Sequence, residues 1–348
     1  MKKLFFLCFL FSCTASYSQQ HGTERTKRAF RSEQFNLSGY GQAVAGLSKS
    51  SFAGVGSSFD VQRVILFATG SLGTHDKFGY MLMLDLGPNI SMQEMYGEWL
   101  PYRFLNIRFG QYKIPFTIEN PMSASRFETV YPSRSVSAMS GSSGDFNQFD
   151  GRGVKAGRDV GLMFSGRAME RDGFHLLEYS AGLFNGTGLN TRDNNNAKDF
   201  VGSAYIQPIN GLKVGGSFYS GKITLSSDTN GLSHGNHRRK AYSTGLVFDS
   251  RYFYVRSEYI SNRTGDLRRQ GFYVSGLWRF VPGRWEVVGK YDLFDSDCSL
   301  SRNEVTDLTF GVNYFLAYLT KIQVDYILTD DLLQGLTHSA AVQLQIFF

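Results

Sequence analysis

The chain ends with THSAAVQLQIFF, residues 337–348, and this stretch decides the fold class. Side chains of an extended strand point by turns to its two faces, so every second residue shares a face. Beyond its first residue one face is apolar, and it carries His338, Ala340, Val342, Leu344, Ile346 and Phe348. The other face is mostly small or polar, and it carries Ser339, Ala341, Gln343, Gln345 and Phe347. This period of two predicts a strand that lies between an apolar medium and a polar one.

The same alternation recurs through most of the chain. In residues 321–326, for example, Ile322 and Val324 alternate with Lys321 and Asp325. In lipid an ionisable face cannot point outward without a cost of about 2–4 kcal/mol per residue near the midplane, so we expect these faces to line an aqueous lumen. About sixteen segments predict an all-β fold, a transmembrane antiparallel up-and-down β-barrel. They are residues 34–45, 58–71, 76–87, 90–100, 103–113, 157–170, 173–184, 198–207, 212–224, 238–249, 251–261, 269–281, 283–295, 304–316, 319–329 and 337–348.

The N-terminus has the layout of a secretory signal peptide. Lys2 and Lys3 precede an apolar run of about nine residues, which is too short to span about 30 Å of hydrocarbon as a helix. Small residues follow, and we expect cleavage after Ser18. Cys13 lies in a partial lipobox, so a lipoprotein signal is an alternative. The expected parts are a signal peptide at 1–18, an N-terminal periplasmic segment at 19–33, and a barrel at 34–348.

The connections between the expected strands tend to alternate in length. Tight turns are expected at 208–211, 249–250, 281–283 and 317–318, and polar loops at 185–197, 225–237, 262–268, 296–303 and 330–336. Short periplasmic turns and longer outer loops are typical of outer-membrane barrels. Residues 114–156 break this rhythm, because they show little alternation. A connection this long in a compact fold is functional or disordered, and we expect a constriction loop here; an ordinary surface loop is the alternative.

Four stretches carry a resemblance to a known family. They are RFGQYKIPF at 108–116 with Glu119, GRDVGL at 157–162, YSAGLFNGTG at 179–188, and KYD at 290–292. In combination they resemble the phosphate-selective porin O and P family. The resemblance covers most of the mature chain. It implies a sixteen-stranded barrel, commonly a homotrimer, that passes anions such as phosphate or other small solutes.

Basic residues near the expected constriction are the candidate pore residues. An anion that enters a narrow pore loses part of its hydration, and Lys and Arg on the wall offset that loss. Acidic and basic residues are equal in number between positions 114 and 159, which favours charge-paired packing and a modest anion preference. The candidates are Arg63, Arg108, Lys113, Arg126, Arg134, Arg152, Lys155, Arg158 and Lys290. Phe348, a terminal aromatic residue on the lipid face, is similar to the signal that the outer-membrane assembly machinery recognises.

The leading hypothesis is therefore a porin of the bacterial outer membrane, a passive channel for small hydrophilic solutes. Two alternatives are a barrel enzyme, either a protease or a phospholipase, and a non-conducting structural barrel. No histidine has a convincing catalytic partner in the sequence, so no enzyme activity is expected. The expected partners are outer-membrane lipids and lipopolysaccharide, the assembly machinery, and small anions or solutes. A net charge of +6 is too mild to suggest a nucleic-acid partner, and no metal or cofactor is expected.

Overall fold

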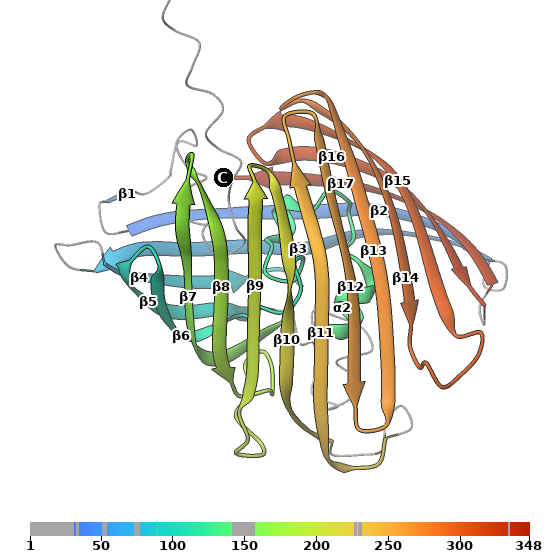
Figure 1. The fold of residues 1–348 in the computed structure, drawn as a ribbon. Coiled ribbons are helices and arrows are strands. Elements are labelled where there is room, and N and C mark those ends of the chain that lie inside the picture. Colours follow the sequence, from blue (N-terminus) through green and yellow to red (C-terminus); the bar gives the residue numbers. More distant parts are fainter. Residues whose placement is uncertain are drawn as a thin grey trace, which may run out of the picture.

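A computed structural model describes residues 31–32, 35–50, 54–72, 77–88, 90–140, 157–225, 228, 232–332 and 335–348. The predicted signal peptide and almost all of the 19–33 segment lie outside these residues. Within them the chain forms one 17-stranded sheet (Figure 1). Its strands are β1 (Arg31–Ser32), β2 (Phe35–Ser50), β3 (Gly54–Leu72), β4 (Phe78–Asp85), β5 (Ser91–Tyr102), β6 (Leu105–Lys113), β7 (Arg158–Arg171), β8 (Phe174–Phe184), β9 (Asp199–Ile209), β10 (Leu212–Leu225), β11 (Gly235–Asp249), β12 (Phe253–Thr264), β13 (Leu267–Val281), β14 (Trp285–Asp295), β15 (Glu304–Ala317), β16 (Thr320–Asp331) and β17 (Gly335–Phe347).

The sheet closes on itself. From β2 to β17 each strand pairs antiparallel with the next, and β17 returns to pair with β2 over the register Thr337↔Ser50 to Phe347↔Tyr40. The last residue completes this seam, because the backbone N–H groups of Gly39 and Phe348 each donate to the other residue's carbonyl oxygen, at 2.8 and 2.9 Å. The two-residue β1 adds only to β2. Closure pairs β2 with β17, the two strands that would otherwise be edge strands, and hydrocarbon would not tolerate such unpaired edges. The predicted sixteen-stranded up-and-down barrel is confirmed.

The two faces of the barrel wall differ as the alternation predicts. On β17, Val342 and Ile346 are 44% and 51% exposed, whereas Gln343 and Gln345 between them are almost fully buried. The apolar residues therefore face outward and the polar residues face inward. A belt of aromatic side chains marks the outer face near the short turns, where Trp278 lies 5.8 Å from Phe280, centroid to centroid. Such aromatic belts lie at the membrane interface in transmembrane barrels.

The short turns are found where the sequence predicts them, but one predicted loop is wrong. Residues 262–268 were expected to be a loop, yet β12 continues to Thr264 and β13 begins at Leu267. This hairpin is continuous because Arg263 and Arg268 are paired strand residues that point outward. Their charge hides the alternation, since the outward positions at this end of the strands are not apolar. Within the described part of the chain, no helix has the length and apolar character needed to cross a membrane.

Candidate functional site: the inward loop and the barrel interior

The segment after β6 enters the barrel instead of lying on its rim. Residues 114–140 run inside the ring of strands and include a 3-10 helix, η1 (Ala124–Arg126), and a short helix, α2 (Arg134–Met139) (Figure 1). α2 contacts β12, β13 and β14. The remainder of the predicted constriction loop, 141–156, lies outside the described residues. We call residues 114–140 the inward loop.

A carboxylate of the barrel wall caps α2. Asp292 on β14 accepts hydrogen bonds from the hydroxyl groups of Ser133 and Ser135, at 2.7 and 2.5 Å. The backbone N–H groups of Arg134 and Ser135 donate to the same carboxylate. The first N–H groups of a helix have no partner within the helix, and they carry a partial positive charge. Ser133, the N-cap residue, makes no side-chain cap of its own, so β14 supplies the cap.

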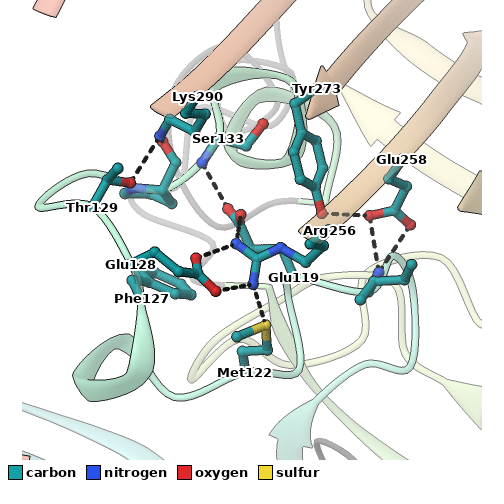
Figure 2. Close-up of polar contacts among 12 residues, drawn as sticks. Glu119, Met122, Phe127, Glu128, Thr129, Ser133, Arg256, Glu258, Tyr273 and Lys290 are labelled. Atoms are coloured by element: carbon teal, nitrogen blue, oxygen red, sulfur yellow. Dashed lines mark hydrogen bonds and ion pairs between the residues drawn. The ribbon is translucent and has the colours of Figure 1, made fainter. Parts of the chain in front are cut away.

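A buried arginine joins the loop to β12. The guanidinium of Arg256 contacts the carboxylates of Glu119 and Glu128 at 2.7 and 2.8 Å, and both acids belong to the inward loop. Figure 2 shows Arg256 between them. Glu119 also accepts the backbone N–H of Ser133, at 2.6 Å. Burial raises the pKa of Glu119 above its ordinary range, while the charge of Arg256 opposes this rise.

Further wall residues bind the loop backbone. Lys290 on β14 donates to the Thr129 hydroxyl group at 3.0 Å and to the carbonyl oxygen of Tyr131 at 2.8 Å. Asp325 on β16 accepts the N–H of Val130 at 2.7 Å. Backbone groups in an irregular segment need partners when water is excluded, and here the wall provides them. A second set of polar wall residues makes similar contacts: Glu258 with Ile118, Asn313 and Gln323 with Glu128, Lys321 with Phe127, and Gln345 with Ser125.

The opposite part of the interior holds a group of basic residues. Arg108 on β6 pairs with Glu98 at 2.8 Å, and Arg158 on β7 pairs with Glu94 at 2.9 Å. Lys113, at the end of β6, donates to a loop carbonyl oxygen, that of Met122. Arg158 is the register partner of Lys113 on the neighbouring strand, and Arg63 on β3 is paired with the inward Gln42. Within the described part of the chain, neither Arg63 nor Lys113 forms an ion pair with a carboxylate.

The structure therefore divides the predicted site residues into groups. Lys113 and Arg158 are neighbours on β6 and β7, Arg108 lies on the same strand as Lys113 in its own ion pair, and Arg63 lies three strands away on β3. Three others secure or belong to the inward loop: Lys290 holds its backbone, Arg134 pairs with Asp307 at 2.6 Å, and Arg126 ends η1. Arg152 and Lys155 lie outside the described residues. Arg256 and Asp292 are not among the predicted site residues, although Asp292 ends the KYD stretch and both lie on the inward faces of their strands.

Part of the interior is apolar, so the ionisable faces line only part of it. Met81, Met83 and Val201 point inward from the wall and are almost fully buried. They form a cluster with Phe116 and Met139 of the inward loop. The loop brings its own apolar side chains into the barrel, and these need an apolar surface to leave water. The wall beneath the loop provides that surface.

Three of the four stretches that resemble the porin O and P family meet at the loop end of β6–β8, whereas the fourth, at 290–292, lies on β14. Asp159 on β7 accepts the backbone N–H groups of Gly186 and Gly188, at 2.5 and 3.3 Å. Gln111 exchanges two hydrogen bonds with Asn190, at 2.8 and 2.9 Å. Gly186 has φ of 76°, a left-handed conformation that favours glycine. These motifs therefore hold the 185–198 loop in place within the structure.

Comparisons with known proteins relate this architecture to porins. No protein-family model matches the chain, and no curated protein matches it. An anion-selective porin from Comamonas acidovorans has a TM-score of 0.65 at 12% identity, covering 90% of this chain and 99% of that one. The outer membrane channel DcaP of Acinetobacter baumannii gives 0.64 at 12%, with 92% and 100% covered. Salmonella typhi OmpF gives 0.65 at 13%, with 92% and 99% covered. At these identities the similarity shows a shared fold, that of outer-membrane porins, and the predicted location in the bacterial outer membrane agrees with it.

Proposed function

We propose that the chain is an outer-membrane porin, a passive channel for small hydrophilic solutes that the inward loop narrows. The observation that carries this proposal is the position of residues 114–140 inside a closed sixteen-stranded barrel. Wall residues on β12, β14 and β16 hold the loop at many points, including Arg256, Asp292 and Asp325. A loop secured in this way reduces the cross-section of the barrel, as a size filter requires.

We propose a modest preference for anions, and phosphate as one of the anions that permeate. Arg63 and Lys113 lie on the β3–β6 side of the wall, where Lys113 also donates to the carbonyl oxygen of Met122, and neither has a carboxylate partner among the described residues. They can replace part of the hydration that an anion loses. The neighbouring ion pairs of Arg108 and Arg158 limit the net positive charge there. A dedicated phosphate site would need more unpaired cations than this wall provides.

Export and assembly belong to the same proposal. Cleavage of residues 1–18 would release a mature chain that begins with a short periplasmic segment, 19–33. Phe348 lies on the lipid face at the seam between β17 and β2, where it is available to assembly machinery before the barrel closes. The family resemblance also supports a homotrimer.

Planar-bilayer recording tests the channel and its selectivity together. Purified wild-type protein should give stepwise conductance, and a salt gradient should give a reversal potential with modest anion preference. Arg63→Gln should reduce that preference, and Arg63→Gln with Lys113→Gln should reduce it further. The matched control is Arg103→Gln with Arg171→Gln, because both side chains are exposed at the short turns and far from the loop.

Two results would contradict the proposal. A correctly folded preparation without channels would exclude a porin and favour the structural-barrel alternative. Equal reversal potentials for wild type and both pore variants would exclude the assigned wall as the origin of selectivity. Competition between phosphate and chloride current in the same apparatus measures whether phosphate permeates as a minor anion or binds tightly.

A further inference from the structure

A group of cations lies on the outer surface of the barrel, where lipid is expected. Lys222 on β10, Arg238 and Lys240 on β11, Arg263 on β12, and Arg268 on β13 are all exposed. They occupy the outward positions near the ends of these strands, alternating with buried inward residues. We call these five residues the rim cations. None of them takes part in the interior described above.

The register places the rim cations directly beside one another. Lys222 is paired with Arg238, Lys240 with Arg263, and Arg263 with Arg268. Opposed Cα atoms in an antiparallel pair are about 5 Å apart, and like charges directly opposite each other destabilise a sheet. An anion that lies between the cations would remove this repulsion, so the arrangement favours anion binding.

The protein supplies little of that negative charge. Within the described residues, the carboxylate closest to a rim cation is that of Asp266, 3.8 Å from Arg263, and it is fully exposed to solvent. Asp193 is engaged with Lys198. Lys222, Arg238 and Lys240 line a hollow of about 260 Å³ together with Ser220, so there is room for an external anionic group between them.

The depth of the rim cations matches that of lipid headgroups. Along β13, Arg268 is about 10 residues from Trp278 in the turn-side aromatic belt, a path of about 33 Å along the strand. At a strand tilt of about 40° this becomes about 25 Å along the barrel axis, which is the height of the apolar band in such barrels. Outward aromatic residues lie just below the cations, where the rings of Tyr242 and Tyr259 are 6.2 Å apart. The cations therefore stand at the far boundary of the apolar band.

The direction of the strands determines on which side of the membrane the rim cations lie. β11 and β17 are separated by an even number of antiparallel pairings, so they run in the same direction. The start of β11, where Arg238 lies, is therefore on the opposite side from Phe348. In transmembrane barrels the short turns are periplasmic, which places the rim cations at the outer leaflet.

We propose that the rim cations form a binding site for a phosphorylated glycolipid of the outer leaflet, with the lipid phosphates between paired cations and the acyl chains along the aromatic residues below. The chemistry is that of lipopolysaccharide, whose phosphate groups lie at this depth. Guanidinium groups bind phosphate through two parallel hydrogen bonds, and three of the five rim cations are arginines. This site is independent of conduction, but it rests on the location of the barrel in an outer membrane.

Native mass spectrometry of the full-length protein in detergent tests the site. The probes are purified lipopolysaccharide, the same lipid after removal of its phosphate groups, and inorganic phosphate alone. The test variant is Lys222→Gln, Arg238→Gln, Lys240→Gln and Arg263→Gln together. The matched control removes the same charge at the other end of the barrel through Arg103→Gln, Arg171→Gln, Arg251→Gln and Arg284→Gln, all of which are exposed.

We expect wild type and control to retain lipopolysaccharide, and the test variant to bind it about a thousandfold more weakly, since each of the four cations near an anionic surface contributes about 1 kcal/mol. Removal of the lipid phosphates should weaken binding to wild type in the same way.

Equal binding by test variant and control would overturn the proposal, and so would equal binding of the two lipids. Tight binding of inorganic phosphate alone would instead indicate a small-anion site. If the fourfold variant is not heat-modifiable, Arg238→Gln with Arg263→Gln provides the same comparison. Normal lipid binding by a preparation without channels would separate this site from the proposed porin function.

Discussion

Replacing Arg256 with methionine should release the inward loop from β12. The side chain is about 1% exposed, and its guanidinium contacts Glu119 at 2.7 Å and Glu128 at 2.8 and 3.2 Å. Methionine preserves much of the volume but leaves two buried carboxylates without their counter-charge. Removal of one partner from a buried ion pair costs about 3–5 kcal/mol. That range corresponds to a change of about a hundredfold to a few thousandfold in the equilibrium between docked and released loop.

Two measurements check this expectation. Denaturant unfolding in lipid vesicles should show a loss of stability in the stated range for Arg256→Met. Single-channel recording should show larger and noisier conductance, because a released loop no longer narrows the barrel at a constant position. The change acts through the loop, so the pairing of β12 with β11 and β13 should remain intact and the variant should stay heat-modifiable.

A triple variant in which residues 119, 128 and 256 are all uncharged, the neutral triad, distinguishes the cost of buried unpaired charge from the cost of lost packing. Glu119→Gln and Glu128→Gln in the Arg256→Met background remove the stranded charges, and this variant should recover much of the lost stability. The reasoning would be refuted if Arg256→Met unfolded like wild type and kept the wild-type conductance. It would also be refuted if the neutral triad were no more stable than Arg256→Met alone, because the cost would then come from lost packing.

Three further predictions concern the cap, the seam and the pH response. Asp292→Ala should destabilise the inward loop by about 1–2 kcal/mol, the usual cost of a lost helix cap, and Asp292→Asn should cost less; equal unfolding of all three proteins would disprove the capping role. Deletion of Phe348 removes its two backbone hydrogen bonds to Gly39 and should lower the heat-modifiable fraction in the outer membrane, whereas Phe348→Tyr should not; unchanged yield after deletion would argue against the seam and the assembly signal. Because burial raises the pKa of Glu119, the folded protein binds this proton more tightly than the unfolded chain. The stability of wild type relative to Glu119→Gln should therefore rise as the pH falls from neutral through the raised pKa, and unfolding curves at several pH values measure it; a constant difference would contradict the raised pKa.

The strands were predictable because the alternation of apolar and polar residues within each strand reflects the lipid on one side and the polar interior on the other. In β17 the residues between Val342 and Ile346 alternate without exception, and both the strand and its inward face follow from that period. The prediction was wrong at the β12–β13 hairpin because the outward residues there, Arg263 and Arg268, are charged. Outward residues are apolar only where the strand crosses the hydrocarbon. The alternation of apolar and polar residues therefore cannot identify the part of a strand that extends beyond the hydrocarbon.

The inward loop was recognised from its length, but its contacts could not be predicted. Asp292 and Ser133 are 159 positions apart, and nothing in either local sequence indicates that one caps the helix that follows the other. Basic residues near the loop were selected as pore candidates because of their charge. The structure shows that several of these charges, such as that of Arg134, are used in ion pairs.

The sequence alone determined that alternate side chains meet lipid and a polar interior, that sixteen strands follow, and that one connection is too long to be a turn. The alternation is visible in residues two positions apart, and the length of a connection is visible as the distance between two strands in the sequence. Both can be read from the linear sequence. Only the tertiary structure decided which cations have no carboxylate partner among the described residues, such as Arg63, and which are bound by the loop, such as Arg256. Whether a cation forms an ion pair depends on its distance from carboxylates on other strands and on the inward loop. Closure of the barrel sets those distances.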